Sequence, residues 1–97
     1  MEFVWDEPKN ESNIRKHGLD FADAHRIFAS PVLVARDERE EYGEERWVGI
    51  GLLDLRAVVV VFSEPDERTI RIISLRKALR HERERFEEHL QKQLGTG

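Results

Sequence analysis

The stretch AVVVVF, residues 57–62, is the segment of the chain with the strongest preference for β-structure. A β-branched run of this length is typical of a strand that is buried on both faces of a sheet. Short turn signals flank it, Asp54-Leu55-Arg56 before it and Glu64 to Arg68 after it. Because both turns are short, residues 46–74 are predicted to form three consecutive antiparallel strands with AVVVVF in the centre.

The strands on either side of this run follow from the residues that flank the two turns. RWVGIGLL, residues 46–53, alternates, with Arg46, Val48, Ile50 and Leu52 on one face and Trp47, Gly49, Gly51 and Leu53 on the other. TIRIIS, residues 69–74, is the strand after the second turn, and PVLVAR, residues 31–36, is a short apolar strand that comes earlier. A polar loop, residues 37–45, joins 31–36 to 46–53. The pattern predicts a four-stranded antiparallel meander sheet.

Helices are predicted on both sides of this sheet in the sequence. Asp6 is placed to cap a helix over residues 7–17, and Gly18 can close it in the left-handed conformation. Asp20 is placed to cap a second helix, whose apolar stripe is Phe21, Ala24, Ile27 and Phe28 and which stops at Ser30-Pro31. A C-terminal helix is predicted over residues 75–94, with Leu75, Leu79, Phe86, Leu90 and Leu94 facing inward. The order α-α-β-β-β-β-α predicts one α+β domain over residues 1–97.

Composition restricts the class of protein. The chain has 97 residues, 39% of them hydrophobic, and no cysteine, which excludes disulfides and thiolate metal sites. No apolar run approaches the roughly 20 residues that span a bilayer, and the first residues, EFVWDEPKNE, are charged where a signal peptide would be apolar. We therefore expect a cytoplasmic protein that does not bind membranes.

Charge is distributed unevenly along the chain. The net charge is −4, yet residues 71–85 hold six Lys/Arg and two Glu, a local charge of +4, so the remainder carries −8. This asymmetry favours one basic face that meets an anion. The alternative is a solvated helix, because Arg80–Glu84, Arg83–Glu87 and Glu88–Lys92 are spaced as i,i+4 ion pairs. Glu82 has no cation four residues on, which leaves it free for another partner.

Several cations are candidates for a phosphate site. Arg46 and Arg71 lie on partly apolar strand faces, and Arg76 and Lys77 follow closely, so that the four together favour a bound phosphate. The alternative for a single arginine is an ion pair with Glu44, Glu45 or Asp37. Trp47 precedes two glycines on its own face, which suits base stacking and equally suits a helix that packs closely on the sheet.

Other classes of catalytic site find little support. His81-Glu82 resembles the start of a zinc-protease motif, but residue 85 is arginine, and a helix break separates His17 from His25. The chain has no nucleophile elbow and no glycine-rich phosphate loop. We predict no metal and no cofactor.

A set of motifs resembles one protein family. FVWDEPK (3–9), NIRKHGLDF (13–21), GEERW (43–47) and RIISLRKA (71–78), followed by Glu82-Arg83, are similar to the BrnT toxins over about residues 3–86. The resemblance implies a RelE-like fold and a ribonuclease toxin of a type II toxin–antitoxin pair. It also implies a partner, the BrnA antitoxin, a ribbon-helix-helix protein that binds DNA and neutralises the toxin; the toxin itself would reach DNA only through it.

The resemblance also implies roles for individual residues. Lys16 and His17 end a helix where they can join Arg46, Arg71 and Arg76 around an RNA phosphate, with His17 transferring protons and the RNA 2′-hydroxyl as nucleophile. Trp47, Lys77, Glu82 and Arg83 are the candidate RNA contacts. The alternative for His17 is a cap on the helix carbonyls.

Two departures from the family bear on activity. The family commonly has tyrosine near Phe86, and RelE-like toxins tend to be basic, whereas this chain is acidic. The alternative function is therefore a non-catalytic, partner-binding module that acts in operon repression with its antitoxin.

Overall fold

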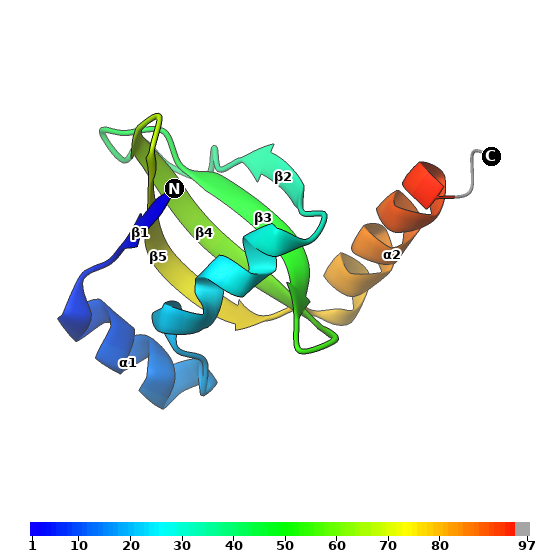
Figure 1. Cartoon of the computed structure of the whole chain (residues 1–97), viewed down its shortest axis with the longest axis horizontal. Helices are drawn as coiled ribbons and strands as arrows, with labels where there is room; N and C mark the ends of the chain where they lie inside the picture. The colour runs from blue at the N-terminus through cyan, green and yellow to red at the C-terminus, as the bar shows by residue number, and fades with distance from the viewer. Residues whose placement is uncertain (95–97) are drawn as a thin grey trace.

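The valine run lies in the middle strand of the sheet, as predicted. The computed structural model describes residues 1–94, and its five strands have the order β1-β5-β4-β3-β2 (Figure 1). The strands β3, β4 and β5 are consecutive and antiparallel, and β4 contains residues 57–62. The elements are β1 (Glu2–Val4), α1 (Glu7–His17), the 3₁₀-helix η1 (Phe21–Ala29), β2 (Leu33–Arg36), β3 (Trp47–Leu53), β4 (Arg56–Asp66), β5 (Thr69–Lys77) and α2 (Arg80–Leu94).

The α+β class is confirmed, but the predicted four-stranded antiparallel sheet is wrong. The chain begins with a strand rather than a helix, and β1 pairs in parallel with β5 from Glu2↔Thr69 to Val4↔Arg71. The sheet is therefore five-stranded and mixed. Three residues carry too little alternation to predict a strand, and β1 forms because the edge of β5 offers unpaired backbone groups.

The second N-terminal helix is 3₁₀ rather than α. Its buried residues, Phe21, Ala24 and Ile27, are spaced three apart, and each is at most 1% exposed. Three residues make one turn of a 3₁₀-helix, so these side chains align on one face against the sheet. The Asp20 carboxylate caps η1 by accepting a 2.9 Å hydrogen bond from the Ala22 amide.

The predicted start of the C-terminal helix is also wrong. β5 continues to Lys77, which pairs with Val58, and α2 begins only at Arg80. Leu75 is fully buried, but as a strand residue, whereas Leu79 and Leu94 are exposed rather than inward. Phe86 anchors α2 on the sheet beside Ile50 and Val59, with Leu90 partly buried next to it, and the helix then projects away from the sheet (Figure 1).

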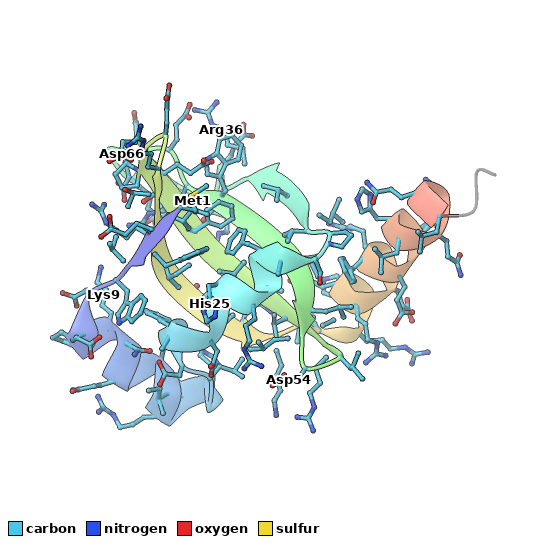
Figure 2. The ribbon with its side chains drawn as sticks, in the orientation of Figure 1. Met1, Lys9, His25, Arg36, Asp54 and Asp66 are labelled. Atoms are coloured by element: carbon cyan, nitrogen blue, oxygen red, sulfur yellow. The ribbon has the colours of Figure 1, made fainter. Side chains whose placement is uncertain are left out.

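The two faces of the sheet are covered differently. η1 packs on the face that carries Val58, Val60 and Phe62, and α2 covers one end of the opposite face. A Cβ atom at Gly51 would lie 2.7 Å from Cγ2 of Ile27, so the glycine floor beside Trp47 is filled by η1 and is not open to a base. The turns of the sheet lie at opposite ends, marked by Asp54 and Asp66 (Figure 2). No helix within residues 1–94 is long and apolar enough to cross a membrane.

Candidate functional site

The Lys16–His17 pair lies beside the end of β5. Asp6 caps the start of α1 through a 3.1 Å bond from the Lys9 amide, and Gly18, at φ 69°, ends the helix. The predicted caps at the start and the end of this helix are therefore confirmed. The two side chains line one pocket with Arg76 and Lys77, the last two residues of β5, and with Leu79, which follows the strand.

Asn13 fixes this arrangement, and sequence reasoning missed it. β1 pairs only with the first part of β5, so the backbone of Leu75 has a free edge. The Asn13 side chain donates from Nδ2 to the Leu75 carbonyl at 2.8 Å, and its Oδ1 accepts from the Leu75 backbone amide at 3.2 Å. These are the two hydrogen bonds that a neighbouring strand would make. It also donates to the Leu19 carbonyl at 3.0 Å. The buried Asn13 side chain thereby ties the C-terminal half of α1 to Leu75, the residue that precedes Arg76 in β5.

Arg76 forms a two-pronged ion pair with Glu82. Its Nη1 and Nη2 donate to the two carboxylate oxygens at 2.8 and 2.9 Å, and the Leu79 amide adds a third bond at 2.8 Å. The guanidinium holds the pKa of the Glu82 carboxyl at about 2, and Glu82 in turn raises the pKa of Arg76. Glu82 is therefore not free for another partner, contrary to expectation. It links the first turn of α2 to the end of β5.

A β-bulge places Arg71 and Arg76 on the same face of the sheet. They are five residues apart, so regular alternation would put them on opposite faces. The register shifts from Val61↔Ser74 to Phe62↔Ile72, which leaves Ile73 as an extra residue in β5. The bulge thus turns both arginines toward the face that α2 covers in part. Lys77, which pairs with Val58, lies on the other face, which η1 covers.

Arg46 and Arg71 converge on Glu44. Arg71 Nη1 donates to Glu44 at 3.2 Å, and Arg46 Nε lies 3.8 Å from the other carboxylate oxygen. The Arg46 guanidinium stacks over the Tyr42 ring at 4.0 Å from its centroid, while its buried Nε has no hydrogen-bond partner among the described residues. The predicted alternative of an ion pair with Glu44 therefore holds for both arginines in this state.

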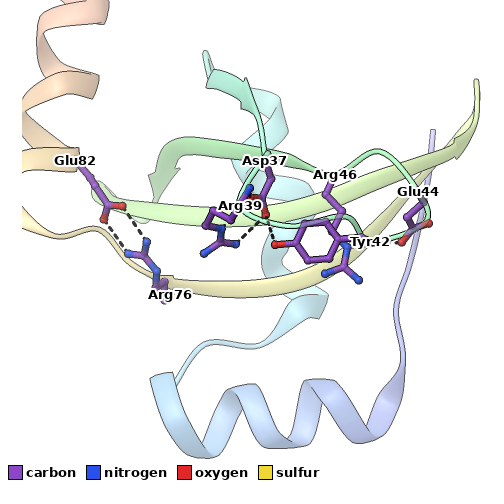
Figure 3. A network of polar contacts seen from close by, with 7 residues as sticks. All are labelled: Asp37, Arg39, Tyr42, Glu44, Arg46, Arg76 and Glu82. Carbon is purple, nitrogen blue, oxygen red and sulfur yellow. Dashed lines mark hydrogen bonds and ion pairs between the residues drawn. The ribbon is translucent and has the colours of Figure 1, made fainter.

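The loop before β3 adds a second feature of the site that the sequence did not predict, an ion pair between Asp37 and Arg39. Asp37, whose side chain is 1% exposed, accepts from Arg39 Nε and Nη2 at 2.8 Å each and from the Tyr42 hydroxyl at 3.3 Å. The Arg39 guanidinium holds the pKa of Asp37 at about 2. Figure 3 shows these residues between the Arg76–Glu82 pair and Arg46. We call Arg39, Arg46, Arg71 and Arg76 the arginine row. The sequence predicts only a polar loop at these residues, and the spacing of Asp37 and Arg39, two residues apart, is the one local signal for their ion pair.

The remaining candidates lie apart from this row. Trp47 is partly buried against the core, and the pocket beside it is lined by acidic side chains, which oppose a polyanion. Those side chains are Glu44, Glu45, Glu64, Asp66 and Glu67. Arg83 is half exposed and pairs with Glu87 at 3.7 Å, on the predicted solvated face of α2. Among residues 1–94, no group of three or more metal-ligating side chains is placed to hold a metal ion.

Known proteins with similar sequences and structures point to one family. Residues 5–82 match the family model described as ribonuclease toxin, BrnT, of type II toxin–antitoxin systems. The crystal structure of the Brucella abortus ribonuclease toxin BrnT is similar, with a TM-score of 0.68 and 35% identity over 82% of this chain and 99% of that chain. No curated protein matches the chain. The matched range ends within the first turn of α2, so Phe86 and most of that helix lie beyond it.

Proposed function

The chain belongs to the BrnT family of ribonuclease toxins of type II toxin–antitoxin systems, and we propose that it cleaves RNA with the RNA's own 2′-hydroxyl as nucleophile. The observation that supports this chemistry most directly is the pocket at the end of β5. It brings an imidazole, from His17, together with the cations Lys16, Arg76 and Lys77. These are the two kinds of group that the reaction requires.

In the proposed reaction, the 2′-oxygen attacks the adjacent phosphorus and the bond to the 5′-oxygen of the next nucleotide breaks. The products are a 2′,3′-cyclic phosphate and a free 5′-hydroxyl. A base takes the 2′-hydroxyl proton and an acid protonates the leaving 5′-oxygen; His17 performs one of these transfers. Lys16, Arg76 and Lys77 neutralise the charge that develops on the phosphorane oxygens.

Arg46 and Arg71 serve a neighbouring phosphate in this proposal. Both lie further along the arginine row, where they share Glu44 rather than the His17 pocket. An RNA phosphate would replace the Glu44 carboxylate between them, since an arginine fork binds both groups in the same way. Trp47 and Glu82 are less suited to contact RNA, because acidic side chains line the pocket beside Trp47 and Glu82 is itself an anion paired with Arg76. Arg83 stays a candidate RNA contact on α2.

A type II system includes an antitoxin protein that neutralises the toxin. We propose that the antitoxin of this chain is a BrnA-like ribbon-helix-helix protein, and that the chain reaches DNA only through it. The acidic surface that surrounds the arginine row complements a basic DNA-binding partner, since the chain carries −8 outside residues 71–85.

One observation favours the alternative, a non-catalytic module that works in operon repression. All four members of the arginine row are paired with carboxylates of the same chain, and the net charge is −4. Both features weaken binding of RNA that lacks other contacts. Cleavage of RNA by the pure protein separates the two functions.

The test is an RNA cleavage assay with purified protein in EDTA, with analysis of the product ends. We expect cleavage to persist and to leave 2′,3′-cyclic phosphates. RNA in which every 2′-hydroxyl is methylated is the matched substrate control and should stay intact. Cleavage that EDTA abolishes would reject the metal-independent reaction, and a protein that never cleaves would favour the alternative.

A further inference from the structure

The loop between β2 and β3 presents one arginine in a fixed position. The Asp37 amide donates to the Arg46 carbonyl at 2.8 Å and so closes the base of the loop. The Asp37 carboxylate then accepts from the backbone and from the side chain of Arg39, and from Tyr42. Few rotamers of Arg39 satisfy a fork of this kind. A long side chain that would otherwise move freely is therefore held in place.

The cationic end of this ion pair faces outward, while its anionic end is buried. The Arg39 side chain is 69% exposed and that of Asp37 is 1% exposed. Two of the three guanidinium nitrogens, Nε and Nη2, bond to Asp37, and no hydrogen bond within residues 1–94 uses Nη1. The surface consequently presents the positively charged N–H donors of Arg39, and the Asp37 carboxylate is buried behind them.

Arg39 lies next to Arg76. Figure 3 shows its guanidinium beside the Arg76–Glu82 pair. Glu82 raises the pKa of Arg76, and the positive charge of Arg39 opposes that rise in part. Arg76 follows the same pattern less strongly, because its side chain is 34% exposed and that of its partner Glu82 is 16% exposed. Two like charges are thus held together by two carboxylates from different elements. An anion between them relieves their repulsion.

We propose that Arg39 and Arg76 together bind one backbone phosphate of single-stranded RNA, beside His17, and that Asp37 is the positioning residue for Arg39. Arg39 acts from the loop and Arg76 from β5, so the phosphate is held from two sides. The choice of RNA as the ligand rests on the proposed function. The pairing of the two arginines rests on their neighbouring places in the structure and does not depend on the identity of the ligand.

The probe is a single-stranded oligoribonucleotide with every 2′-hydroxyl methylated, which cannot be cleaved through that group. Its Kd is measured by fluorescence anisotropy at several salt concentrations. Arg39→Ala is expected to weaken binding about tenfold, through loss of charge-assisted hydrogen bonds. Arg26→Ala is the matched control, because it also removes an exposed, ion-paired arginine but on η1, where Arg26 contacts Asp54 at 2.6 Å. An unchanged Kd in Arg39→Ala, or an equal loss in the control, would overturn the proposal.

The salt dependence tests whether the two arginines share a phosphate. Each phosphate contact to a single strand contributes about 0.7 to the slope of log K against log salt concentration. The double variant Arg39→Ala/Arg76→Ala is expected to lose about 0.7 from the slope, equal to one contact. A loss of about 1.4 would mean two separate phosphates and would reject the shared site.

Asp37 is tested through Arg39. Asp37→Asn is expected to weaken binding of the probe in the wild-type background and to have no further effect in Arg39→Ala. A further effect in that background would assign Asp37 a role in the fold alone. Thermal unfolding of each variant shows that the proteins compared are folded.

The outcome is independent of catalysis. A protein that binds the probe through Arg39 but never cleaves unmethylated RNA would reject the proposed reaction and support this binding site. If Arg39→Ala instead left RNA binding unchanged and weakened binding to the antitoxin, the arginine pair would face that partner and the RNA proposal would be wrong.

Discussion

His17 differs from its neighbours in the pocket because an imidazole can both accept and donate a proton. Replacing it with Gln keeps a polar side chain of similar reach and removes proton transfer. His17→Gln is expected to lower the rate of RNA cleavage by about 10²–10⁴-fold. The cost in stability should be small, about 0.3–1 kcal/mol, which is the typical contribution of a side-chain contact at an exposed helix end.

The measurement is single-turnover cleavage by each folded variant in EDTA. Arg71→Ala and Arg76→Ala should also lose rate, through weaker binding and weaker stabilisation of the charged phosphorane. Lys92→Ala is the control, since this lysine is exposed on α2 and forms a long ion pair with Glu88, at 4.0 Å. Full activity in His17→Gln would return that residue to the role of a helix cap.

Glu82 makes the stability of the fold depend on pH. Its pKa is about 2 in the folded protein, below the ordinary value of 4.5, because Arg76 stabilises the ionised form. The contribution of this pair is complete above about pH 4.5 and is lost as the pH falls toward 2. Within that window, the free energy of unfolding of the wild type is expected to fall more steeply with decreasing pH than that of Glu82→Gln.

Urea denaturation at a series of pH values measures both curves. Asp37 titrates in the same region, since its pKa is also about 2, but it is present in both proteins and cancels in the difference. Parallel curves would show that the Arg76–Glu82 pair adds nothing to stability.

At the scale of elements, the contact between α1 and the free edge of β5 depends on one side chain. Asn13→Ala leaves the buried amide and carbonyl of Leu75 without partners, and each such group costs about 1–3 kcal/mol. We expect a loss of at least about 2 kcal/mol in unfolding free energy, together with slower RNA cleavage, because Lys16 and His17 would no longer be held beside Arg76.

Chemical denaturation and cleavage assays on the same preparations test this prediction. Glu11→Ala, an exposed change on α1, is the control and should alter neither quantity by much. A folded Asn13→Ala protein with wild-type stability would contradict the assignment of Asn13 as the residue that ties α1 to the sheet.

At the scale of the whole molecule, the charge pattern predicts a basic partner. The gene for this chain should adjoin one that encodes a small protein with a basic ribbon-helix-helix pattern. The two proteins are expected to elute together in size-exclusion chromatography at a fixed ratio, and the complex should weaken as salt concentration rises. An elution volume that is unchanged on mixing would reject the pairing.

The amino-acid sequence alone is sufficient to predict the middle of the sheet and the ends of the first helix. A run of valines between two short turns strongly favours a central strand. The caps Asp6, Gly18 and Asp20 act through hydrogen bonds to the backbone within a few residues of themselves. The i,i+4 pairs of α2 are local in the same sense, and Arg80–Glu84, Arg83–Glu87 and Glu88–Lys92 are all present. The identity of most candidate cations also came from the sequence.

The grouping of those cations, by contrast, depends on contacts between distant parts of the folded chain. The bulge at Ile73 places Arg76 on the same face of the sheet as Arg71, although residue 76 was predicted to lie in a helix, and the loop carrying Asp37 brings Arg39 into the row. β1 pairs with the first half of the edge of β5, and Asn13 bonds to the second half. No local sequence pattern predicts either contact. The physical reason is common to all of these: the partners are far apart in sequence, and a side chain's energy in such a position is set by neighbours that only the folded chain supplies.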